Sequence, residues 1–75
     1  MMKIIDLNQT ILSLIQEDPE IKDILFELGF KDIIKPGMLQ TVGRIMTIYK
    51  GSKMQSIDIQ IIKNAFIEKG YNIKE

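Results

Sequence analysis

Residues 18–30 read Asp-Pro-Glu-Ile-Lys-Asp-Ile-Leu-Phe-Glu-Leu-Gly-Phe, and this stretch carries the signals of a short helix with two defined ends. Its first residue, an Asp, is a favoured N-cap, and Pro19 fits the first helical position because its φ angle is already helical. Apolar residues then recur with the spacing of one helix face, at Ile21, Ile24, Leu25 and Leu28. Gly29 is typical of the left-handed residue that ends a helix, and Phe30 is expected to fold back onto the last turn. The pattern predicts a helix over 19–28.

Four further helices are expected from similar signals. The segment 58–69 has Asp58 as its cap candidate and an apolar face. It ends at Gly70, as the helix over 19–28 ends at Gly29. Shorter helices are predicted over 10–16, 36–44 and 47–54, with starts at Thr10, Pro36 and Thr47. Glycines inside the last two of these cost about 1 kcal/mol each relative to Ala.

The two chain ends are rich in residues that favour extended structure. Lys3-Ile4-Ile5 and Tyr71-Asn72-Ile73 either pair as a two-strand clasp or remain separate, because two strands alone are only marginally stable. The chain has no linker and no low-complexity stretch. The expected fold is therefore mainly all-α: one small domain over 1–75, a compact array of four to five short helices with a tiny pairing of the ends.

The composition excludes several classes of chemistry. The 75 residues include no Cys, no His and no Trp, and ten basic residues balance ten acidic ones. Without Cys or His there is no thiol nucleophile, no imidazole ligand and no Ser–His pair. A net charge of zero does not suit a dedicated nucleic-acid binder. We therefore expect no enzyme activity, no cofactor, no metal and no nucleic-acid partner.

Hydropathy points to a cytoplasmic protein with exposed apolar surface. No apolar run approaches the roughly 20 residues of a membrane span, and no basic start with an apolar stretch of about 7–15 residues is seen, so we expect neither a membrane span nor a signal peptide. Apolar residues make up 45% of the chain, more than so small a core encloses. If the surplus clusters at the surface, it marks an interface, so we expect a protein partner or self-association as a homodimer.

Carboxylates lie together on the outer face of the helix predicted over 19–28. Glu20, Asp23 and Glu27 share that face, so they form either a weak cation site or acid–base pair, or a solvated surface. The solvated surface is favoured, because acidic residues suit the N-terminal end of a helix. The same charge argues against a helix-turn-helix DNA reader built from 10–28, since its second helix would be acidic.

The middle of the chain is basic and contains glycines next to cations, which lets an anion approach the backbone. The candidate binding residues here are Thr41, Gly43, Arg44, Tyr49, Lys50, Gly51 and Lys53. They predict a surface for a protein partner or, alternatively, a small-anion site where Arg44, Lys50 and Lys53 converge on a phosphate or carboxylate. The plainer interpretation is that the glycines bend short helices and the lysines are solvated.

Three methionines repeat every eight positions, at Met38, Met46 and Met54. Methionine is flexible, so it suits both irregular cores and adaptable binding surfaces. Core filling where short helices cross is the favoured interpretation. Tyr49 is the aromatic residue most suited to an interface, where Tyr is enriched.

The order and spacing of several short motifs resemble the domain-of-unknown-function 1858 family over nearly the whole chain. The motifs are Asp18-Pro19-Glu20-Ile21, Leu28-Gly29-Phe30-Lys31, Met38-Leu39-Gln40-Thr41-Val42-Gly43-Arg44, Lys50-Gly51-Ser52-Lys53 and Glu68-Lys69-Gly70-Tyr71. The resemblance implies a bundle of short helices that stands alone or works beside a hemerythrin-like or PAS-type sensor protein. It supplies no catalytic residue.

A related branch of that family carries a Cys-x-Gly-Cys element and is similar to the N-terminal domain of iron–sulfur-cluster repair proteins. The corresponding residues 29–34 contain no Cys here, so no thiol or metal chemistry transfers to this chain. The sequence therefore predicts a non-enzymatic interaction or accessory module, with small-anion binding as the alternative.

Overall fold

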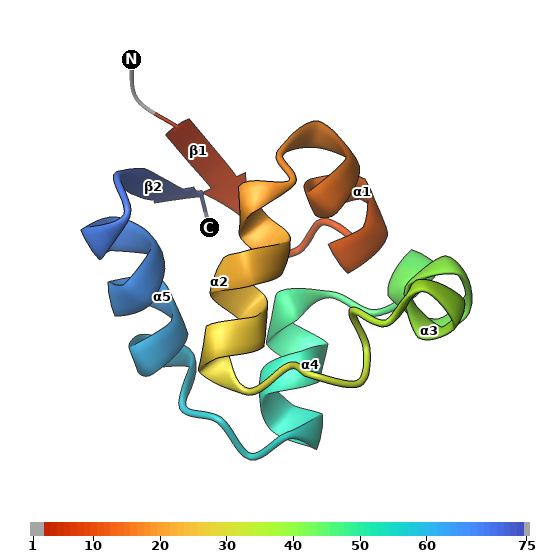
Figure 1. The fold of residues 1–75 in the computed structure, drawn as a ribbon. Coiled ribbons are helices and arrows are strands. Elements are labelled where there is room, and N and C mark those ends of the chain that lie inside the picture. The colour runs from red at the N-terminus through yellow and green to blue at the C-terminus, as the bar shows by residue number, and fades with distance from the viewer. Residues whose placement is uncertain (1–2, 75) are drawn as a thin grey trace.

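The computed structural model describes residues 3–74, and in that range the chain forms five α-helices, one 3-10 turn and two short strands (Figure 1). In chain order the elements are β1 (Lys3–Asp6), α1 (Ile11–Glu17), α2 (Glu20–Leu28), α3 (Pro36–Thr41), η1 (Val42–Arg44), α4 (Ile48–Met54), α5 (Ile59–Glu68) and β2 (Tyr71–Lys74). The expectation of a mainly helical domain with paired chain ends is confirmed.

Side-chain caps fix the starts of three helices where the sequence predicts them. The hydroxyl oxygen of Thr10 accepts a hydrogen bond from the backbone N–H of Ser13 at 3.3 Å, and Thr47 accepts one from Lys50 at 3.1 Å. The carboxylate of Asp58 accepts from the N–H of Gln60 at 2.8 Å. Each cap satisfies a backbone donor that has no partner inside its helix.

The central helix α2 ends as its sequence predicts. Gly29 adopts a left-handed φ of 112°, and its N–H donates to the carbonyl of Phe26 at 3.1 Å. The N–H of Phe30 then reaches back to the carbonyl of Leu25 at 2.9 Å, which completes a Schellman-type end. At the other end, Asp18 accepts from the N–H of Glu20 at 3.1 Å, so it caps this helix although Pro19 stands between them.

The predicted helix over 36–44 is only partly correct. The α-helix ends at Thr41, and residues Val42–Arg44 continue as a tighter 3-10 turn. The hydroxyl of Thr41 donates to the carbonyl of Gly37 at 2.9 Å, a back-bond that often bends a helix. Gly43 lies in this turn, and a Cβ atom there would lie 2.9 Å from the side chain of Leu39.

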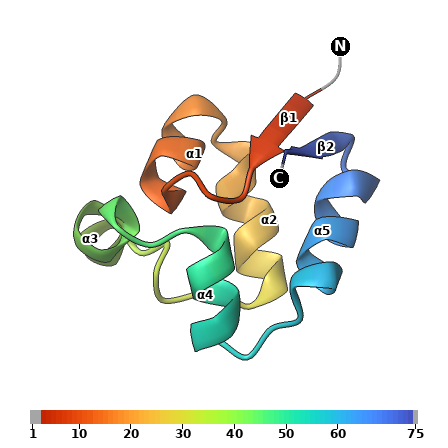
Figure 2. The same cartoon turned by 180° about the vertical axis from the view of Figure 1, so that it is seen from behind.

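The two chain ends pair as a small parallel sheet. Lys3 lies opposite Tyr71 and Ile5 lies opposite Ile73, so the start and the end of the described chain run side by side (Figure 2). This pairing joins residues separated by most of the chain, and α5 packs beneath it. The expected two-strand clasp is confirmed, and its direction is parallel.

The core gathers around α2, which lies in the middle of the molecule between α4 and α5 in both views (Figures 1 and 2). Every described element except the 3-10 turn contributes a buried apolar side chain. The largest fully buried side chains are Phe30, Phe66, Ile5, Leu7, Ile11, Leu25, Ile48 and Ile62. Within residues 3–74, no helix has the length and apolar character needed to cross a membrane.

Candidate functional site

A cluster of titratable side chains joins the two terminal strands to the α1–α2 junction. The hydroxyl of Tyr71 donates to a carboxylate oxygen of Asp18 at 2.5 Å. The ammonium of Lys3 lies 3.6 Å from that same oxygen and 2.9 Å from the carboxylate of Glu20. The buried Tyr71 ring also packs edge-on against Phe66, with 5.4 Å between ring centres. The cluster therefore ties both strands to the helices.

The pKa shifts in this cluster favour the charge states already present at neutral pH. Burial and the hydrogen bond to Asp18 raise the pKa of Tyr71 to about 12. The hydrogen bond from Tyr71 lowers the pKa of the Asp18 carboxyl below its usual range. The hydrogen bond to Glu20 raises the pKa of Lys3. Because none of these shifts moves a pKa toward neutrality, the cluster is suited to holding structure and not to proton transfer.

We expect Tyr71→Phe to lower the free energy of unfolding by about 1 kcal/mol, because it removes one hydrogen bond to a partly exposed carboxylate. The difference in the free energy of unfolding between this variant and the wild type should be greatest at neutral pH. It should shrink as pH falls through the lowered pKa of Asp18, and again as pH rises above about 10 toward the Tyr71 pKa of about 12. Urea unfolding across pH measures this, and a difference that is constant at all pH values would contradict it.

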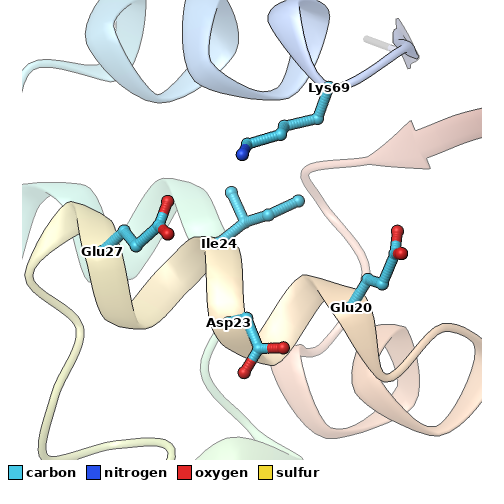
Figure 3. A pocket seen from close by; sticks show the side chains of 5 residues that line it. All are labelled: Glu20, Asp23, Ile24, Glu27 and Lys69. Carbon is cyan, nitrogen blue, oxygen red and sulfur yellow. The ribbon is translucent and has the colours of Figure 1, made fainter.

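The acidic face of α2 lies across from the end of α5. Glu20, Asp23, Ile24, Glu27 and Lys69 line an open cavity of about 360 Å³ (Figure 3). The carboxylates diverge, and Asp23 points away from Lys69 (Figure 3). Among residues 3–74, no group of three or more acidic side chains is placed to hold a metal ion. The arrangement is that of a solvated face with one lysine opposite.

The binding residues predicted in the basic segment differ in how exposed they are and in which cavity they line. Thr41, Arg44, Lys50 and Lys53 are exposed, Tyr49 is half-buried, and Gly43 and Gly51 are buried. Arg44 lines an open cavity of about 400 Å³ with Thr10, Leu12, Ser13 and Gln16. Gly51 lines a separate groove. These residues therefore do not all line one cavity.

The two buried glycines each allow a close approach by an apolar side chain. A Cβ atom at Gly51 would lie 2.8 Å from the ring of Phe30, and one at Gly43 would lie 2.9 Å from the side chain of Leu39. Real Cβ atoms essentially never approach other atoms this closely. Both glycines stand out in the sequence, and Leu39 is a near neighbour of Gly43 in the chain, but Phe30 is brought to Gly51 only by the fold.

A groove lined by methionines lies next to Gly51, and we call it the methionine groove. It is formed by Phe30, Asp32, Ile33, Met38, Val42, Met46, Gly51, Met54 and Gln55, and its volume is about 90 Å³. Met38 comes from α3, Met46 from the segment after η1 and Met54 from α4, so the fold brings methionines of three different segments to one groove.

The favoured interpretation of the methionines as core filling is correct only for Met46, which is half-buried against the core. The side chain of Met38 is 42% exposed and that of Met54 is 70% exposed. Short helices leave their ends at the surface, so Met38 and Met54 lie at the rim of the groove. Sequence spacing could have suggested the shared surface, but not which methionine is buried.

Together, these features define a small helical domain with an apolar surface groove and a cluster of polar side chains that links its two terminal strands to the helices. The family model for a domain of unknown function (DUF1858) matches residues 5–63, and the chain belongs to this family. The fold is very similar to the crystal structure of a conserved domain protein from Streptococcus pneumoniae TIGR4, with a TM-score of 0.92 and 34% sequence identity. The likeness covers 99% of this chain and 94% of that one. The curated proteins include no significant match.

Proposed function

We propose that this domain is a non-enzymatic interaction module whose methionine groove holds an apolar side chain of a protein partner. One observation carries the proposal: three methionines from three different segments line a single groove, and two of them are exposed. Flexible, polarisable methionine side chains adapt to the shape of a partner. Exposed apolar side chains that gather in one place are typical of interaction sites.

The size of the groove favours one aliphatic side chain as its occupant. Its volume of about 90 Å³ is smaller than the cavity of about 150 Å³ that accepts benzene in an engineered protein. Full burial of a Leu or Met side chain contributes about 1.5–3 kcal/mol, which is too little for stable binding alone. The partner must therefore add contacts around the rim, where Asp32 and Gln55 supply polar groups.

The family resemblance supports an accessory role beside a hemerythrin-like or PAS-type sensor protein in the cytoplasm, and such a protein would present the apolar side chain. The alternative occupant of the groove is a side chain from a second copy of this chain. Sedimentation at micromolar concentration tests this alternative, because it would detect a homodimer. Small-anion binding by Arg44, Lys50 and Lys53 stays a prediction. Titration with phosphate tests it, through saturable NMR shifts at those three residues.

We expect peptides selected against this domain from a display library to bind in the methionine groove through one aliphatic side chain such as Leu or Met. Met38→Gln and Met54→Gln should each weaken such a peptide about tenfold, because one buried apolar contact of about 1.4 kcal/mol is lost. Ile61→Gln on α5 is the matched control, since Ile61 is 57% exposed and lies outside the groove. NMR of methionine methyl groups locates the binding.

Two results would contradict the proposal. In one, the selected peptides bind both methionine variants as tightly as the wild type. In the other, binding leaves the methyl signals of Met38, Met46 and Met54 unmoved, which places the peptide on another surface.

A further inference from the structure

A second concave surface, which we call the lysine shelf, lies on α2 and the loop that follows it. It is lined by Lys22, Phe26, Lys31, Ile34, Lys35 and Pro36, and it encloses about 260 Å³. It shares no lining residue with the methionine groove. The proposed function above makes no use of it.

The shelf contains an aromatic side chain that the core does not use. Phe26 lies outside the buried stripe of α2, and its side chain is 50% exposed. The ammonium of Lys31 lies 5.6 Å from the centre of the Phe26 ring, within cation–π range. The aromatic ring and a cation are therefore already together at the surface, next to the buried Ile34.

Positive charge at the shelf is only weakly compensated. Lys35 lies 3.4 Å from the carboxylate of Asp32, but both side chains are largely exposed, so this pair contributes little. Within residues 3–74, neither Lys22 nor Lys31 takes part in an ion pair. Asp23 and Glu27, the other acids nearby on α2, line the acidic cavity instead. The helix thus separates its charges onto two flanks.

We propose that the lysine shelf binds a short acidic peptide segment of a protein partner. An apolar side chain of that segment packs on Phe26 and Ile34, and carboxylates on either side of it pair with Lys22, Lys31 and Lys35. Charge complementarity selects the peptide, and the apolar contact anchors it.

A peptide matches this surface better than a nucleic acid or a membrane does. Single-stranded nucleic acid needs several aromatic platforms along a basic groove, whereas Phe26 is the one aromatic residue lining the shelf. The chain is neutral overall, so it lacks the broad positive field that draws proteins to phosphate-rich surfaces. Three lysines around one apolar patch fit an occupant with one apolar side chain and a few carboxylates.

The test is an NMR titration of the full chain with the synthetic peptide acetyl-Glu-Glu-Leu-Phe-Glu-Glu-amide. We expect saturable shifts at Phe26, Lys31 and Lys35 and none at the methionine methyl groups, so the result is independent of the groove. Lys31→Glu combined with Lys35→Glu should weaken binding more than tenfold, and Phe26→Ala about fivefold. Lys69→Glu combined with Lys74→Glu makes the same change in formal charge away from the shelf, and it should leave the affinity within twofold.

Three results would overturn the proposal. The first is the absence of saturable shifts at millimolar peptide. The second is evidence that charge alone explains the binding. This would be an equal loss of affinity in both charge-reversed variants, or an equal affinity for a peptide that has Gly-Ser in place of Leu-Phe. The third is stronger binding of phosphatidylglycerol vesicles or oligothymidine than of the peptide, which would assign the shelf to a membrane or to nucleic acid.

Discussion

Phe30→Ala is expected to lower the free energy of unfolding by about 3–5 kcal/mol. A domain of 75 residues has roughly 4–11 kcal/mol in total, so this single change should remove a third or more of the stability. The side chain of Phe30 is 1% exposed, and its ring fills the space above Gly51. Its removal leaves a cavity beside the end of α2 that the short surrounding helices cannot close.

Phe26→Ala is the matched control for this experiment, because it deletes the same atoms from the same region of the chain. Phe26 lies on the outer surface of α2, so we expect its removal to cost less than about 1 kcal/mol. Urea unfolding followed by circular dichroism measures both variants. Similar losses of stability for the two variants would mean that Phe30 contributes no more to the core than the exposed Phe26 does.

The second large effect is expected at Gly51, where Ala should destabilise the protein by about 2 kcal/mol. In an exposed helix, Gly→Ala would stabilise by roughly 1 kcal/mol through helix propensity. Here the added Cβ meets the Phe30 ring at 2.8 Å, and overpacking of a tight core typically costs 1–3 kcal/mol or more. The ring is 1% exposed and packs in the core, so we expect the clash to outweigh the gain in propensity.

Gly37→Ala in α3 provides the matched control with the opposite sign. A Cβ at Gly37 meets nothing within 4 Å, so this variant should be more stable than the wild type by about 0.5–1 kcal/mol. Introducing Gly51→Ala into a Phe30→Leu background should cost less than in the wild type, because the ring is gone. Equal costs of Gly51→Ala in both backgrounds would show that the two residues do not touch.

Local signals in the sequence predict most of the helices correctly. The caps Thr10, Thr47 and Asp58 act within two or three residues of themselves, and the turn at Gly29 uses only its own neighbours. Such interactions depend little on the rest of the fold. The predicted helix over 36–44 is too long because the α-helix ends at Thr41, whose hydroxyl bonds back to the Gly37 carbonyl, and a 3-10 turn follows.

The candidate surfaces were much harder to predict. The spacing of Met38, Met46 and Met54 was visible in the sequence, but their division between core and rim was not. Phe26 and Lys31 lie on either side of the Gly29 turn, but the sequence pattern did not indicate that the cation would lie over the aromatic ring. Burial and side-chain proximity are properties of the packed structure, since they depend on which helix faces which.

The sequence by itself determined where most of the helices of this protein begin and end, because caps, glycines and apolar spacing act over a single turn of the chain. Only the tertiary structure decided that the two ends run parallel, that Gly51 makes room for Phe30, and that methionines from three segments share one groove. These features join residues far apart in the chain. They form only when burial of the apolar faces outweighs the entropy lost in bringing those residues together.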